Sequence, residues 1–82
     1  MTSGILTSRR VAVVTGGARG IGLAIGQWFL AHNYQVALLD IDKTTLDTTM
    51  KNFAGSADII GLHCDVSRPQ EVERAAQEIE KK

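Results

Sequence analysis

The sequence predicts an α/β protein in which three strands and three helices alternate along the chain in the order βαβαβα. Three short apolar runs of strand length are separated by segments whose apolar residues recur with helical spacing. The apolar runs are continuous rather than alternating, which is typical of strands buried on both faces of a parallel sheet. Right-handed crossovers between successive strands then give a parallel sheet of strand order 3-2-1.

The first half of the chain supplies a strand, a glycine-rich turn and a helix. Residues 10–15, RVAVVT, predict the first strand, and residues 20–32 predict the helix after it. Asn33 is expected to end that helix, because Asn tolerates the left-handed backbone found at helix C-termini. We expect five residues at helical spacing to form the inner face of the helix: Ile21, Ala24, Ile25, Trp28 and Phe29.

The second half of the chain repeats the pattern twice. Strands are predicted at 34–40 and 58–63, and Asp42 is expected to cap a helix over 43–53. The inner face of this helix should contain Leu46, Met50 and Phe53. A last helix begins near Pro69. Its expected inner face is Val72, Ala75, Ala76 and Ile79.

Composition narrows the class of protein. The 82 residues suffice for one small domain, and the formal net charge of zero argues against nucleic acid or an anionic membrane as a partner. The single cysteine, Cys64, cannot form an internal disulfide, and the N-terminal residues do not resemble a leader, so we expect a cytoplasmic protein. Cys64 is interpreted as a small buried residue, and its neighbour His63 does not make a metal site with it.

The stretch VAVVTGGARGIG, residues 11–22, is the most informative part of the sequence. Gly16 is expected to turn the chain sharply, Gly20 to let an anion approach the N–H groups that open the helix, and Gly22 to let the helix lie close to the strand. The alternative is a tight turn that binds no ligand. The loop lacks the Gly-Lys-Ser/Thr of an NTPase phosphate-binding loop, and Ile25 stands where the pattern G-x-G-x-x-G needs its third glycine.

The segment TGGARGIG resembles the T-G-x-x-x-G-x-G signature of the short-chain dehydrogenase/reductase family. The resemblance implies a Rossmann-type fold that binds a nicotinamide dinucleotide, with residues 1–82 as the N-terminal part of one NAD(P)-binding domain. It also implies that the backbone around Gly16, Arg19, Ile21 and Gly22 holds the pyrophosphate.

Asp40 follows the second strand and lies 18 positions after Gly22, where a dinucleotide site places a carboxylate that binds the adenosine ribose. Its charge would also repel a 2′-phosphate, which favours NAD over NADP. The alternative is an aspartate that only caps a helix or a turn. Arg19 favours NADP instead, but Ile41 supplies no cation at the other position customary in the family, so we expect NAD and leave NADP possible.

Two further implications of the resemblance concern the adenine and the chemistry. Asp65 and Val66 match the family's Asp-Val pair that binds adenine, although a plain turn aspartate is the alternative. The family transfers hydride between the cofactor and an alcohol or ketone with a Tyr-x-x-x-Lys pair. Here the one tyrosine, Tyr34, has Leu38 four residues later, so it is not the catalytic tyrosine.

We therefore expect every catalytic residue to lie beyond Lys82, so that residues 1–82 alone are inactive. We expect the parent enzyme to act on a small molecule and to form a tetramer or dimer. Two other interpretations remain open at this point. One is a regulatory module that binds a dinucleotide without catalysis. The other is a truncated product without activity.

Overall fold

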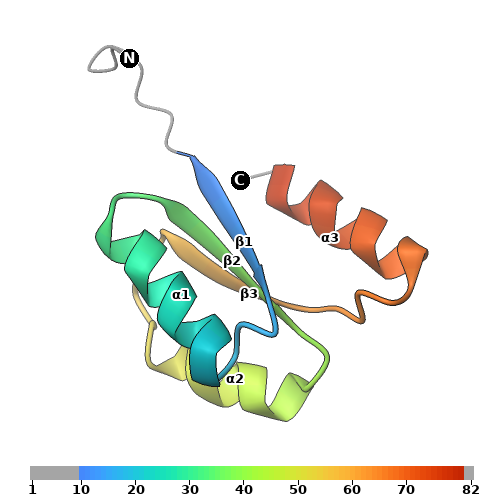
Figure 1. The fold of residues 1–82 in the computed structure, drawn as a ribbon, viewed down its shortest axis with the longest axis horizontal. Helices are drawn as coiled ribbons and strands as arrows, with labels where there is room; N and C mark the ends of the chain where they lie inside the picture. Colours follow the sequence, from blue (N-terminus) through green and yellow to red (C-terminus); the bar gives the residue numbers. More distant parts are fainter. Residues whose placement is uncertain (1–9, 81–82) are drawn as a thin grey trace.

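The computed structural model describes residues 10–80, so the ends of the predicted domain, 1–9 and 81–82, lie outside the described residues. Three strands and three helices alternate as predicted (Figure 1). Their bounds are β1 Val11–Thr15, α1 Gly20–Ala31, β2 Gln35–Asp40, α2 Lys43–Lys51, β3 Ile59–His63 and α3 Pro69–Glu80. None of the helices within residues 10–80 is long and apolar enough to cross a membrane.

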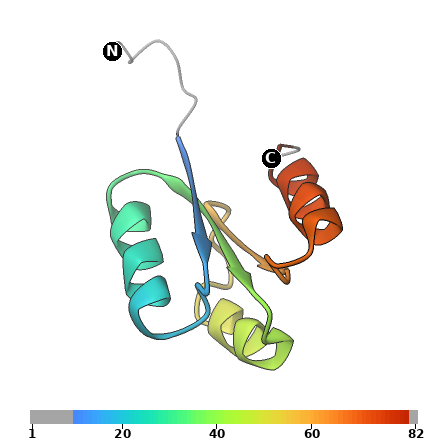
Figure 2. The same cartoon turned by 45° about the vertical axis from the view of Figure 1, so that its right-hand side comes forward.

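The three strands form one parallel sheet of order β1-β2-β3, which confirms the predicted topology. In the register, Ala37 of β2 lies between Val13 of β1 and Ile60 of β3. Helices α1 and α2 cover one face of the sheet and α3 lies on the other (Figures 1 and 2). All three strands therefore end at the same edge of the sheet, where α/β proteins of this kind bind ligands.

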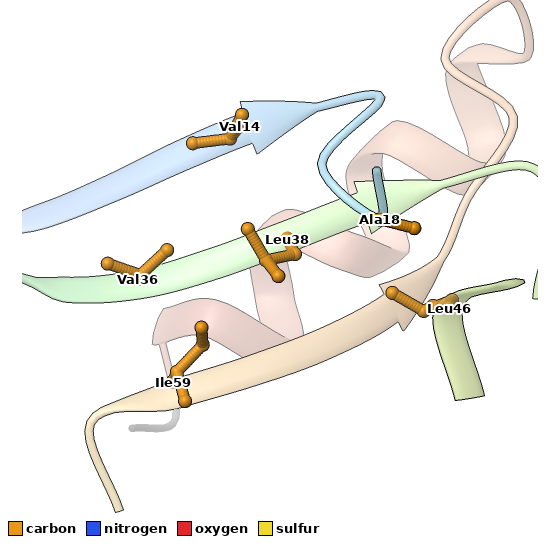
Figure 3. Packing of buried hydrophobic residues seen from close by; sticks show 6 residues of the cluster. All are labelled: Val14, Ala18, Val36, Leu38, Leu46 and Ile59. Atoms are coloured by element: carbon orange, nitrogen blue, oxygen red, sulfur yellow. The ribbon is translucent and has the colours of Figure 1, made fainter. Parts of the chain in front are cut away.

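The core is centred on β2. Residues 36–40 of this strand are all buried, and the side chain of Leu38 is fully buried. On the face of α1 and α2, Leu38 packs with Val14, Val36, Leu46 and Ile59, and Figure 3 shows these side chains together. On the face of α3, a second cluster contains Ala37, Leu39, Cys64 and Ala75. The continuous apolar run of β2 thus reflects burial on both faces, as predicted.

The same prediction is wrong for β1. Val14 is buried, but Val11 and Val13 are 44% and 50% exposed. Their side chains lie on the face of α3 because residues alternate faces along a strand. The apolar side chains packed with α3 in that cluster come from β2 and β3, not from β1.

The predicted inner faces of α1 and α3 also need correction. Ala24, Ile25 and Trp28 are exposed, and Ile21 is 81% exposed. Only Phe29 of the predicted set packs on the core, together with Leu23 and Leu30. In α3, Ala75 and Ile79 pack as predicted, whereas Val72 and Ala76 are exposed. All three residues predicted for the second helix, Leu46, Met50 and Phe53, belong to the core or pack on it, although α2 ends at Lys51 and Phe53 lies just beyond it.

Gly26 explains which face of α1 turns inward. Glycine has no side chain, and a Cβ at this position would lie 2.7 Å from Cδ2 of Leu38. Because α1 is apolar on nearly all sides, hydrophobic spacing alone does not select its buried face. The closest approach of the helix to β2 selects it, and that approach requires a residue without a side chain.

Asn33 ends α1 as expected, with φ at 69° in the left-handed region. The N–H of Asn33 donates to the carbonyl of Leu30 at 3.3 Å, and the N–H of Tyr34 donates to the carbonyl of Phe29 at 3.0 Å. This pair of bonds is the Schellman motif. The hydrophobic contact of the motif is made by the Tyr34 and Phe29 rings, which meet edge to face with their centroids 4.8 Å apart.

We expect Asn33→Ala to lower the free energy of unfolding by about 1 kcal/mol, because alanine lacks the short polar side chain with which Asn tolerates the left-handed region. Asn33→Gly should leave stability unchanged or slightly raised, since glycine adopts this conformation without strain. Urea unfolding of the two variants in the full-length protein that carries this chain measures the difference. Equal losses in both variants would show that the Asn side chain, rather than the backbone conformation, matters.

Candidate functional site

Three segments meet at the carboxyl end of the sheet. They are the loop between β1 and α1, the residues after β2, and the residues after β3. An open pocket of about 300 Å³ lies between them. Its lining residues are Thr15, Gly16, Leu39, Asp40, Ile41, Cys64, Asp65 and Val66. The structure therefore gathers the carboxylates and the glycine loop that the sequence analysis singled out.

The glycine loop turns at Gly16, as the sequence predicts, and Gly20 also has a positive φ, which was not predicted. Gly16 and Gly20 have φ at 65° and 60°, and a Cβ at either position would meet no atom within 4 Å. Gly22 serves a different purpose from the one expected. A Cβ on Gly22 would collide with the carbonyl oxygen of Gly16, so this glycine lets the first turn of α1 lie against the loop. Gly26 provides the close contact with the strand instead.

The N-terminus of α1 is not capped by its own N-cap residue. Arg19 is extended, with φ at −160°, and its side chain makes no hydrogen bond to the helix. The first turn contains no acidic residue, and the first intrahelical bond runs from Leu23 N–H to the Arg19 carbonyl at 3.3 Å. The N–H groups of residues 20–22 precede that bond, so they are available to an anion, and the helix dipole favours one there.

Asp40 is buried and tied to the backbone on both sides. Its Oδ2 accepts a hydrogen bond from the N–H of Ala18 at 3.1 Å, and its Oδ1 accepts one from the N–H of Asp42 at 3.0 Å. The interpretation as a turn aspartate therefore describes part of its role. A carboxylate offers about four acceptor positions, so these two bonds leave room for further donors.

Asp42 caps α2, as predicted. Its Oδ1 accepts from the N–H of Thr45 at 3.0 Å, and the Thr45 hydroxyl donates to Oδ2 at 2.8 Å. These bonds lower the pKa of Asp42, and the nearby Arg19 guanidinium lowers it further. Arg19 Nη2 lies 3.8 Å from Asp42 Oδ2. The only basic side chain in the loop thus lies beside a carboxylate of α2.

The residues after β2 and β3 are also linked to one another. His63 Nε2 lies 3.0 Å from the carbonyl oxygen of Ile41, so the imidazole donates there, and the Ile41 side chain is exposed. Cys64 N–H donates to the carbonyl of Asp40 at 3.0 Å. Cys64 is buried as expected, and burial raises the pKa of its thiol, which keeps the sulfur protonated and unsuited to nucleophilic attack.

Asp65 and Val66 form the third side of the pocket. Asp65 Oδ1 accepts hydrogen bonds from the N–H and the hydroxyl of Ser67 at 3.0 and 2.6 Å, and these bonds lower the pKa of Asp65. The carboxylate is therefore ionised at neutral pH and can accept a bond from an amine. Val66 is exposed, and its N–H has no hydrogen-bond partner among residues 10–80.

Thr49 contacts the glycine loop from outside the lining of the pocket and was not predicted from the sequence. It is buried on α2, and its Oγ1 donates to the carbonyl of Ala18 at 2.5 Å. A threonine three residues after Leu46 lies on the buried face of a helix, and this position was the signal that could have identified it. Among the described residues, no three His, Cys, Asp or Glu side chains are grouped to hold a metal ion.

Comparisons with known proteins agree with this geometry. A family model for short chain dehydrogenases matches residues 10–82. An uncharacterized oxidoreductase of Mycobacterium bovis is 38% identical over 68 residues, which are 83% of this chain and 28% of that protein. Carbonyl reductase family member 4 of Danio rerio is 38% identical over 72 residues, 88% of this chain and 30% of that protein. The chain thus spans less than a third of these relatives.

Solved structures show the same similarity. A short-chain dehydrogenase/reductase from Burkholderia phymatum, in complex with NAD, superposes with a TM-score of 0.76 at 31% identity. The superposition covers 85% of this chain and 25% of that one. Family match, sequence identity and fold together show that this chain, a Rossmann-type α/β unit, belongs to the short-chain dehydrogenase family of oxidoreductases.

Proposed function

We propose that this chain is the N-terminal, cofactor-binding part of an oxidoreductase that transfers hydride between a nicotinamide dinucleotide and a small alcohol or ketone, with NAD favoured over NADP. The observation that carries the proposal is the uncapped start of α1, with open space at Gly20, beside the carboxylate of Asp40. The Burkholderia phymatum relative was solved with NAD, and the Danio rerio relative is named a carbonyl reductase.

The pyrophosphate would be held by backbone rather than by side chains. The N–H groups at 20–22 and the positive end of the α1 dipole supply donors and charge for an anion. Gly20 has no side chain of its own, and the space where its Cβ would lie is open. The guanidinium of Arg19, 71% exposed, adds a mobile positive charge at the same end of the helix.

The adenosine would lie across the ends of β2 and β3. Asp40 would accept the ribose hydroxyls with the acceptor capacity that its two backbone bonds leave. Ile41 is exposed beside it and offers an apolar surface to the base. Asp65 and the N–H of Val66 would then bind the amine and a ring nitrogen of adenine, a donor and acceptor pair that matches one edge of that base.

The preference for NAD follows from the charges at the end of β2. Asp40 and Asp42 place two carboxylates within one turn of chain, and a 2′-phosphate there would be repelled. The one cation that could compensate, Arg19, lies beside Asp42.

The groups for proton transfer would come from beyond this chain. Tyr34 precedes β2, at the edge of the sheet opposite to the pocket, and its ring packs against Phe29. It therefore cannot reach a ligand at the carboxyl end of the strands. When bound, the nicotinamide supplies or accepts the hydride, while the residues of this chain bind and orient the cofactor. We further propose that these 82 residues alone are inactive, and that the whole enzyme is a cytoplasmic homo-oligomer.

The first test compares two glycines that both have a positive φ. Gly20 and Gly55 have φ at 60° and 91°, and a Cβ at either would meet no atom within 4 Å. Ala at each position should cost about 1 kcal/mol of stability. Only Gly20→Ala places a methyl group over the helix N-terminus, so it should weaken NADH binding at least about tenfold, whereas Gly55→Ala should not change it.

Fluorescence titration of the full-length protein with NADH and NADPH measures both affinities. No binding of either cofactor to the wild type would refute the proposed function. Equal weakening by the two glycine variants would refute the site at α1. Binding without turnover of any alcohol or ketone would favour a regulatory module over an enzyme.

The second test concerns Asp40. Asp40→Ser removes the charge that repels a 2′-phosphate, so the ratio of kcat/KM for NADPH to that for NADH should rise at least about tenfold. Binding of both cofactors should weaken too, because the variant loses the bond to Ala18. Asp47→Ser removes an exposed carboxylate of α2, which pairs with Lys43, and should leave the ratio unchanged. A constant ratio in Asp40→Ser would remove Asp40 from cofactor choice.

The third test concerns the ion pair of Arg19 and Asp42. Asn also caps helices, so Asp42→Asn should keep the cap of α2 while it frees Arg19 and removes a negative charge. Because the pair is exposed, the NADPH to NADH ratio should rise only about two- to fivefold. Steady-state kinetics with both cofactors measure it. If Arg19→Gln in the Asp42→Asn background does not reverse the gain, Arg19 does not contact the 2′-phosphate.

A further inference from the structure

We propose that Thr49 of α2 is a positioning residue that fixes the phosphate-binding loop in its binding conformation. This inference rests on the proposed function, since it concerns the same cofactor site. Thr49 itself lies in the last turn of α2, outside the lining of the pocket. It acts on the loop through one buried hydrogen bond, from its hydroxyl to the carbonyl oxygen of Ala18.

The loop is held at two successive residues. Gly17 N–H donates to the carbonyl of Leu39 at 3.1 Å, and Ala18 N–H donates to Asp40 Oδ2 at 3.1 Å. The methyl group of Ala18 is 1% exposed and belongs to the core cluster, where Figure 3 shows it beside the strands. Thr49 adds the bond to the Ala18 carbonyl, so both polar groups of Ala18 have a buried partner.

Planarity of the peptide bond transmits this contact to the ligand side. In a trans peptide, the carbonyl of Ala18 and the N–H of Arg19 point in opposite directions from one rigid plane. Because Thr49 holds the carbonyl toward α2, the N–H of Arg19 is turned away from α2. The peptide plane that Thr49 fixes, between Ala18 and Arg19, is therefore the one directly before the peptide that carries the N–H of Gly20.

The residues on either side of Gly17 and Ala18 restrain the loop less. Gly16 and Gly20 flank the held residues, and both adopt backbone conformations that glycine leaves easily. Without Thr49, the peptide between Ala18 and Arg19 would lose its only hydrogen bond within residues 10–80, and its carbonyl would be buried without a partner. The loop would then spend less time in the conformation that binds the pyrophosphate, and apparent affinity falls in proportion to that population.

The test uses three variants of two neighbouring threonines in the full-length protein. Thr49→Val keeps the shape of the side chain and removes the hydroxyl, whereas Thr49→Ser keeps the hydroxyl. Thr48→Val is the control, because Thr48 is exposed on α2 and its hydroxyl donates only to the carbonyl of Thr44 within its own helix. Each variant is titrated with NADH and NADPH, and its KM for the cofactor and kcat are measured.

We expect Thr49→Val to weaken both cofactors by about tenfold and equally, with kcat changed less than about twofold, as expected for a lost population of the binding conformation. Thr49→Ser should bind within about threefold of the wild type, and Thr48→Val should match it. Hydrogen exchange of the unliganded proteins should show faster exchange at residues 16–20 in Thr49→Val alone, because the amide of Ala18 opens more often.

The outcomes separate this inference from the proposed function. Unchanged exchange and unchanged affinity in Thr49→Val would overturn the role of Thr49. Faster exchange with unchanged affinity would overturn it too, because the loop would not need to be held. Equal losses in Thr49→Val and Thr49→Ser would show a packing role rather than a hydrogen bond. If the wild type binds neither cofactor, the proposed function fails, and a cofactor-positioning role for Thr49 fails with it, although the exchange measurement still decides whether Thr49 holds the loop.

Discussion

The carboxylate of Asp40 is the constraint on which the site depends, because it joins the ends of two strands. One oxygen accepts the N–H of Ala18 in the loop after β1, and the other accepts the N–H of Asp42 before α2. Burying a carboxylate costs free energy unless hydrogen-bond donors satisfy it. Moving the loop and the turn apart would therefore leave this carboxylate buried without its donors. The position of the glycine loop is thus set from β2, and the loop places the N-terminus of α1 near the carboxyl end of the sheet.

The N-termini of α1 and α2 differ in how their free backbone N–H groups are satisfied. Asp42 satisfies the first turn of α2 with its carboxylate, whereas Arg19 gives no side-chain bond to α1. Open N–H groups are costly inside a protein and cost little where water or an anion can meet them. The loop that precedes the uncapped helix is also held from two other elements, by Asp40 at the end of β2 and by Thr49 of α2. A loop held by hydrogen bonds, next to backbone N–H groups without partners, suits a site that binds an anion without rearranging.

Local sequence features predicted the elements and the edge of the sheet at which the candidate residues meet, because they act over a few residues. Asn33, Gly16 and the cap of Asp42 adopt the conformations that their residue types favour. The buried face of α1 was not predictable in this way, since Gly26 selects it through contact with Leu38 on another element. Thr49 was missed for the same reason, because its partner lies 31 residues away in the sequence.

The exposure of the apolar side chains of β1 was not predicted either, because burial of a strand depends on contacts with other elements. A continuous run of apolar residues is typical of a strand inside a sheet, yet β1 has a neighbour on only one side within residues 10–80. Open apolar edges favour pairing with other strands, and proteins usually cover them. The sequence of β1 is therefore suited to a central strand, whereas its surroundings in the described residues are those of an edge. This mismatch supports the proposal that the chain forms one part of a wider sheet, in which Val11 and Val13 would be buried.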